Sequence, residues 1–167
     1  TALLFPFSGL LEKLACRLVR DDKVPEQIQI LDERLLSTPP VAIGRCQEVA
    51  ETMARISMDA LRTGCRLIEH YDAKEAQAVR ETEKEADQYE DMLGTYLVKL
   101  GRENLSERDN RQVSKLLHII GDFERISDHA VNVVESAEEM RSKGLHFSPQ
   151  AKQELNVLTS AVGEIMD

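Results

Sequence analysis

An apolar stripe with helical spacing runs through the segment from Ser106 to Gly144. Its members recur at alternating steps of three and four residues: Leu116, Ile119, Phe123, Ile126, Ala130, Val133 and Ala137. This spacing places them along one face of an α-helix. Ser106, with Asp109 three positions later, predicts the N-terminal cap, and Gly144 predicts a left-handed stop. The helix would be about 55 Å long at 1.5 Å per residue. A rod of this length must pack against other long helices.

Three other segments show the same periodicity. The first ends near His70, and its stripe is Cys46, Val49, Met53, Ile56, Ala60 and Leu67, widened by Ile43, Ala50, Ala54, Leu61, Cys65 and Ile68. The second begins after Asp72 and stops at Gly101, with the stripe Val79, Thr82, Ala86, Tyr89, Leu93, Tyr96 and Leu100. The third follows Ser148 and Pro149, and its stripe is Ala151, Leu155, Leu158, Val162 and Ile165.

The composition agrees with an all-α fold. Aromatic residues make up 4% of the 167 residues, there is no tryptophan, and hydrophobic residues make up 42%, which is typical of a helical bundle. Short loops between long helices make neighbouring helices antiparallel. The sequence therefore predicts an antiparallel bundle of three long helices plus the start of a fourth. The fourth stripe still continues at Asp167, so we expect that helix to extend further.

Several classes of function are disfavoured. The formal net charge is −9, and the Lys and Arg residues are interspersed with more numerous acids, which argues against a nucleic-acid surface. Three cysteines without a CxxC pair indicate a reducing compartment such as the cytoplasm. No stretch reaches the roughly 18 consecutive apolar residues of a membrane span. We find no P-loop, nucleotide-binding fingerprint or Ser-His-Asp arrangement, so we do not expect an enzyme.

Four domain segments are expected. Residues 1–20 are unusually apolar, and both a helix that packs on the body and the end of a membrane part remain open interpretations. Residues 21–40 form a connector that is broken by Pro25 and ends at Pro39 and Pro40. Residues 41–144 contain the three long helices, and residues 145–167 contain the first helix of a truncated second unit. The unfinished unit and the apolar N-terminal segment also predict self-association.

Two helices each contain a pair of acidic residues four positions apart, Glu83 with Asp87 and Glu124 with Asp128. This spacing places both carboxylates of a pair on one helical face, about 6 Å apart, where they can bridge a hard cation or contact a basic partner. The two pairs either face each other or point away, depending on the handedness of the bundle. A solvated acidic face is the simpler alternative. The histidines His118 and His129 lack the Glu-x-x-His motif of di-iron bundles.

A family resemblance enters through these same helices. Residues 117–133, LHIIGDFERISDHAVNV, strongly resemble the signature helix of PhoU-like domains, and residues 83–90, EKEADQYE, are similar to its partner helix. Residues 4–11 and 31–39 resemble the end of the membrane part and the connector of sodium/phosphate cotransporter-family proteins. Two features depart from the family: Ser127 stands where glycine is usual, and only one complete three-helix repeat is present.

The resemblance implies a non-catalytic regulatory domain of a sodium-dependent phosphate transporter, on the cytoplasmic side of the inner (plasma) membrane. Its expected partners are the transporter membrane domain or sensor and transport proteins, and a homo-oligomer is expected. The family motif assigns Glu83, Asp87, Glu124 and Asp128 as ligands of an iron or zinc cluster, with no other cofactor. The alternatives are a free-standing PhoU-type regulator of a phosphate ABC transporter and its sensor kinase, or a metal-binding helical bundle.

Overall fold

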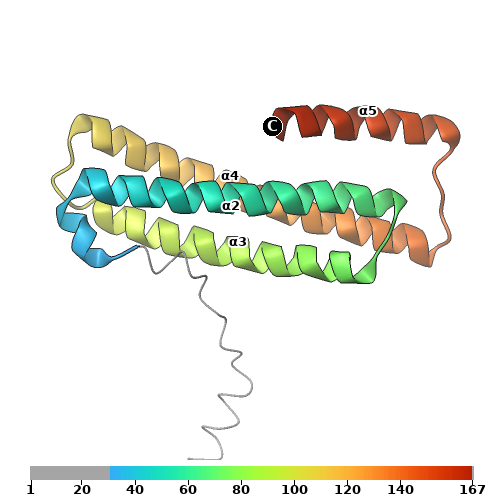
Figure 1. Cartoon of the computed structure of the whole chain (residues 1–167), viewed down its shortest axis with the longest axis horizontal. Coiled ribbons are helices and arrows are strands. Elements are labelled where there is room, and N and C mark those ends of the chain that lie inside the picture. The colour runs from blue at the N-terminus through green and yellow to red at the C-terminus, as the bar shows by residue number, and fades with distance from the viewer. Residues whose placement is uncertain (1–30, 167) are drawn as a thin grey trace, which may run out of the picture.

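Three long helices lie side by side and form the body of the protein (Figure 1). The computed structural model describes residues 31–166, in which α2 (Pro39–Glu69), α3 (Ala73–Leu100) and α4 (Glu107–Ser142) run antiparallel in succession. A short 3-10 helix, η3 (Glu33–Ser37), precedes them, and α5 (Pro149–Met166) turns back along the outside of the bundle. The predicted all-α bundle is confirmed. The apolar segment at 1–20 and the connector residues up to 30 lie outside the described part of the chain.

The helix ends follow the predicted capping chemistry. The Ser106 hydroxyl accepts a hydrogen bond from the Asp109 N–H at 3.1 Å and donates to the Asp109 carboxylate at 2.7 Å. At the start of α3, the Asp72 carboxylate accepts from the N–H of Glu75 at 3.0 Å. Gly144 follows α4 with φ of +62°, a left-handed conformation that glycine adopts without strain. Local sequence therefore determines where α3 begins and where α4 begins and ends.

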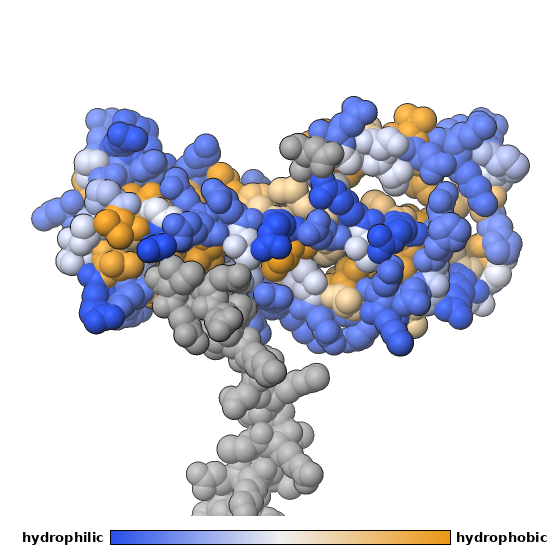
Figure 2. Space-filling view, viewed as in Figure 1, coloured by the Kyte–Doolittle hydropathy of each residue, from blue (hydrophilic) through white to orange (hydrophobic). Residues whose placement is uncertain are grey.

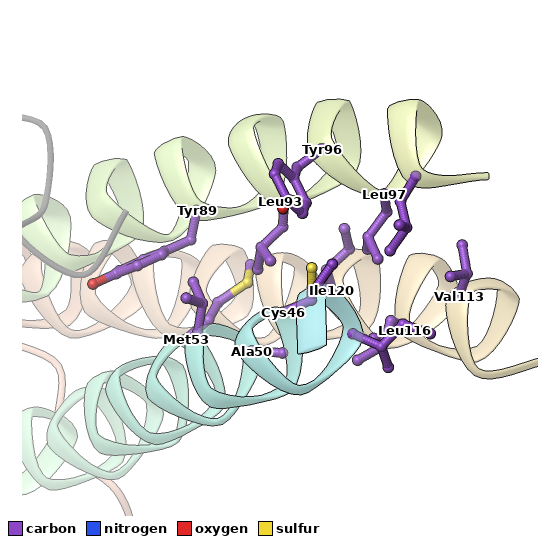
Figure 3. Packing of buried hydrophobic residues seen from close by; sticks show 14 of the residues in the cluster. Cys46, Ala50, Met53, Tyr89, Leu93, Tyr96, Leu97, Val113, Leu116 and Ile120 are labelled. Atoms are coloured by element: carbon purple, nitrogen blue, oxygen red, sulfur yellow. The ribbon is translucent and has the colours of Figure 1, made fainter. Parts of the chain in front are cut away.

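The core consists of two apolar clusters arranged along the bundle axis. The first cluster lies toward η3, and Figure 3 shows its residues converging from all three long helices, among them Met53, Leu93 and Ile120. The second cluster lies toward the turn between α2 and α3 and includes Leu67, Val79 and Val134. Burial of these side chains against one another provides most of the driving force for packing the three helices.

Small residues separate the two clusters and bring α2 close to α4. Ser57 in α2 and Ser127 in α4 are both fully buried, between the two clusters along each helix. Further along α2, a Cβ atom placed on Gly64 would be 3.0 Å from the backbone oxygen of Ala130. No larger side chain fits at that position without moving one helix. This close approach sets the position of α4 against α2, and hence of the residues on its outer flank.

The buried face of α4 differs from the predicted stripe. Leu116, Ala130 and Ala137 are buried as predicted, whereas the other four members of the stripe are only half-buried: Ile119, Phe123, Ile126 and Val133. Their places in the core are taken by Val113, Ile120, Ser127 and Val134. The buried face is thus rotated toward the flank that bears Glu124, because α4 packs against α3 as well as α2. Glu124 consequently lies at the edge of the core.

The part of the connector that is described packs onto one end of the bundle. The Tyr96 hydroxyl donates a hydrogen bond to the backbone oxygen of Asp32 at 2.9 Å, and Lys99 pairs with Glu33 at 2.5 Å. Leu35 in η3 contacts the first core cluster. The connector is therefore held against α3 at the point where the chain enters the bundle.

Helix α5 is only partly covered by the rest of the chain. Leu155 and Val162 are half-buried beside α2, whereas Leu158 and Ile165 are 60% and 85% exposed. Figure 2 shows an opening between α5 and the bundle. Across residues 31–166, every helix is either too short or too polar to span a lipid bilayer.

Candidate functional site

The four predicted carboxylates lie on facing flanks of α3 and α4. Asp128 interacts electrostatically with Glu83 and Asp87 across the two helices, and Asp87 interacts with Glu124. The antiparallel arrangement therefore brings the two acidic pairs together, which the sequence left open. We call these four residues the carboxylate seam.

Burial and mutual repulsion both disfavour charge on the seam. Partial burial raises the pKa of Glu83, and the neighbouring charges of Asp87 and Asp128 raise it further. The pKa of Asp87 and that of Glu124 are raised for the same reasons, with burial as the larger cause and Asp128 as the next. Asp128 is thus the common source of repulsion for the other three carboxylates.

Little positive charge offsets this repulsion. Lys84 and Arg125 lower the pKa of Glu83 and Glu124, respectively, but less than burial and the acidic neighbours raise it. Within the described residues, no side chain of the seam forms an ion pair with Lys, Arg or His. A bound cation or a basic partner would remove this repulsion.

The carboxylate oxygens of the seam are suitable metal ligands, but they lie too far apart to hold one ion in this arrangement. Carboxylate oxygens are ligands for Ca²⁺, Mg²⁺ and Mn²⁺, and they also bind iron and zinc. Between residues 31 and 166, however, no three His, Cys, Asp or Glu side chains converge closely enough to hold one ion. A metal at the seam would therefore require the carboxylates to change rotamer and draw together.

Two acidic residues that were not among the predicted ligands extend the seam. Glu90 interacts with Glu124, and Asp91 interacts with Asp87. Glu90 could have been found from the sequence, because positions 83, 87 and 90 follow helical spacing on one flank. Asp91 lies four positions after Asp87 on α3, the same spacing as the predicted pairs, so it too could have been found from the sequence.

A polar groove of about 420 Å³ continues from one end of the seam between α3 and α4. It is lined by Gln77, Arg80, Glu83, Lys84, Asp128, Val131, Asn132 and Glu135. Arg80 binds Glu138 of α4 at 2.6 Å, and the same carboxylate accepts a hydrogen bond from the Tyr71 hydroxyl at 2.8 Å. These bonds join α3 and the preceding turn to α4. Sequence reasoning did not find this network, because its members are 58 and 67 residues apart.

The remaining candidate residues lie away from the seam. His118 and His129 are exposed on the opposite flank of α4. Burial raises the pKa of the Cys46 thiol to about 12 and also raises that of Cys65, so both favour the unreactive thiol form. Neither cysteine has the features of an activated nucleophile.

These features define the class of the protein as an all-α bundle with an acidic seam between two of its helices. Residues 50–137 match the model of the PhoU domain family. Because this match covers more than half of the chain, the protein belongs to the PhoU domain family, which acts in the regulation of phosphate homeostasis. The matched region contains both acidic pairs. No curated protein and no solved structure matches the chain.

Proposed function

We propose that this chain is the cytoplasmic regulatory domain of a sodium-dependent phosphate transporter and that it adjusts phosphate uptake through protein contacts. The proposal rests on the PhoU family and on the resemblance of residues 4–11 and 31–39 to the cotransporter connector. The docking of η3 against α3 is consistent with it, because a firmly held connector would transmit movement between the bundle and a preceding domain.

The uncompensated negative charge of the carboxylate seam is the observation that supports a regulatory role most directly. Three of its four carboxylates have raised pKa values, so the free seam is strained by its own charge. A multivalent cation, which we propose to be iron or zinc, would relieve this strain and draw α3 and α4 together. The surface offered to a partner would then depend on whether the metal is bound.

The function is tested in cells that carry the gene for the intact protein. We expect the double variant Glu124→Gln, Asp128→Asn to change sodium-dependent uptake of radiolabelled phosphate at least about twofold, at equal protein levels. Asp122→Asn, an exposed change outside the seam on the same helix, should leave uptake unaltered. Unchanged sodium-dependent uptake, accompanied by altered signalling of a phosphate-responsive kinase, would instead favour the free-standing regulator of an ABC transporter.

The metal is tested separately by elemental mass spectrometry of the purified, untagged protein. We expect iron or zinc to persist through dialysis and to be lost from the double variant but not from Asp122→Asn. Absence of metal from every form would reject the cluster and return the seam to a solvated acidic face or a contact for a basic partner.

A further inference from the structure

A second cavity lies at the end of the bundle opposite η3, away from the carboxylate seam. It has a volume of about 380 Å³ and is lined by residues from the ends of α2 and α4, the turn after α2, linker residues 144–147 and the first turns of α5. Figure 2 shows the opening between α5 and the bundle on this side. We propose that this cavity binds a small organic phosphate with a flat aromatic ring, such as a nucleoside monophosphate.

One part of the cavity wall is apolar and aromatic. It includes Tyr71 and Phe147, together with Ile68, Met140 and Leu145. Leu145 is 54% exposed and Phe147 is 36% exposed, although both are large apolar residues in a linker. An apolar ligand surface placed here would cover them and gain free energy in proportion to the area removed from water. Two aromatic rings in the wall favour a flat ligand.

The other part of the wall is positively charged, which is unusual in a chain with a net charge of −9. Among the described residues that line the cavity, Arg141 and Lys152 are cationic and Glu69 is the only acidic residue. Arg141 stacks on the Tyr71 ring, with 4.8 Å between its guanidinium carbon and the ring centroid. Among the described residues, neither Arg141 nor Lys152 has a carboxylate partner.

The helix dipole accounts for the position of Arg141 but not for that of Lys152. Arg141 lies in the last turn of α4, where a positive charge offsets the partial negative charge of the helix terminus. Lys152 lies at the start of α5, where a positive charge is unfavourable for the helix. An anion in the cavity would offset the charge of Lys152, which lines the wall.

The two parts of the wall together specify the ligand class. Inorganic phosphate would satisfy the cations and leave the aromatic wall exposed, whereas an uncharged ring would leave the cations unpaired. A guanidinium group pairs with phosphate through two parallel hydrogen bonds while its face remains stacked on an aromatic ring. The volume is within the range of about 300–1,000 Å³ that is usual for small-molecule sites. An organic phosphate uses both parts of the wall.

The test is isothermal titration of the whole chain with adenosine monophosphate, adenosine and inorganic phosphate. We expect saturable binding of adenosine monophosphate, with the other two at least about tenfold weaker. Lys152→Gln and Arg141→Gln should each weaken binding about tenfold or more, since each removes a charge-assisted hydrogen bond. Lys143→Gln is the matched control, because Lys143 pairs with Glu139 outside the cavity wall. Phe147→Leu should weaken the binding of adenosine monophosphate but leave the binding of inorganic phosphate unaltered.

Three results would overturn the proposal. The first is no binding of adenosine monophosphate at millimolar concentration. The second is equal affinity for adenosine monophosphate and inorganic phosphate. The third is an equal loss of affinity for adenosine monophosphate in Lys143→Gln and Lys152→Gln. Far-ultraviolet circular dichroism of each variant separates loss of binding from loss of folding. Because the seam is not in this cavity, failure here leaves the proposed regulatory function standing, and the uptake experiment can fail independently.

Discussion

Replacing Asp128 with Asn should stabilise the metal-free protein. Asp128 raises the pKa of Glu83, Asp87 and Glu124, so the substitution removes one partner from three repulsive interactions while keeping the side-chain shape. Like charges on neighbouring helical positions cost about 0.2–0.5 kcal/mol per pair, so the expected gain is about 0.5–1.5 kcal/mol. Because Asp128 is exposed, screening by solvent favours the lower half of that range.

The effect is measured on the chelator-treated protein by thermal and urea unfolding. Both are monitored by circular dichroism at 222 nm. At this chain length a gain in that lower half, about 0.5–1 kcal/mol, corresponds to a rise in Tm of roughly 1–4 °C. The control is Asp122→Asn, which makes the same change of charge six positions earlier on α4, outside the seam. The difference in stability between the two variants should become smaller in about 1 M salt, because salt screens the repulsion between the carboxylates.

The pH dependence of the free energy of unfolding independently checks that the seam destabilises the metal-free protein. An acid whose pKa is raised in the folded state binds more protons when folded than when unfolded. The destabilisation from the seam is therefore absent below the ordinary carboxyl pKa of about 4, and it develops as pH rises through the raised values. Asp128→Asn should flatten this decline in stability. A variant no more stable than Asp122→Asn, or a gain insensitive to salt, would refute the reasoning.

Two further substitutions test the packing of α2 against α4. Gly64→Ala should be less stable than Gly121→Ala by about 1–3 kcal/mol in urea unfolding. The new methyl group at Gly64 would lie 3.0 Å from the backbone oxygen of Ala130, whereas a methyl group at Gly121 would meet no atom of another described element within 4 Å. Equal stability of the two alanine variants would contradict that close approach. Ser57→Ala should be neutral or stabilising, since its buried hydroxyl has no hydrogen-bond partner among residues 31–166. Ser127→Ala should instead cost about 1 kcal/mol, because its hydroxyl donates to the Glu124 carbonyl at 2.7 Å, and the opposite order in thermal unfolding would contradict this assignment.

The sequence by itself determined the helices and their ends. Apolar residues at steps of three and four, together with Ser106, Asp72 and Gly144 at the boundaries, depend only on interactions within a few residues of one another. Such local chemistry also identified the two acidic pairs, because a spacing of four places both carboxylates on one face of any helix. The resemblance to PhoU-like domains rested on the same local pattern and is confirmed by the PhoU match.

Only the tertiary structure decided how these elements meet. The facing of Glu83 and Asp87 toward Asp128 depends on the handedness of the bundle, which no local pattern encodes. The rotation of the buried face of α4 arises because that helix packs against two neighbours at once, and a single stripe cannot predict it. The bond from Tyr71 to Glu138 likewise joins residues 67 positions apart. Helix formation is local, whereas a site built between helices depends on the packing of distant segments.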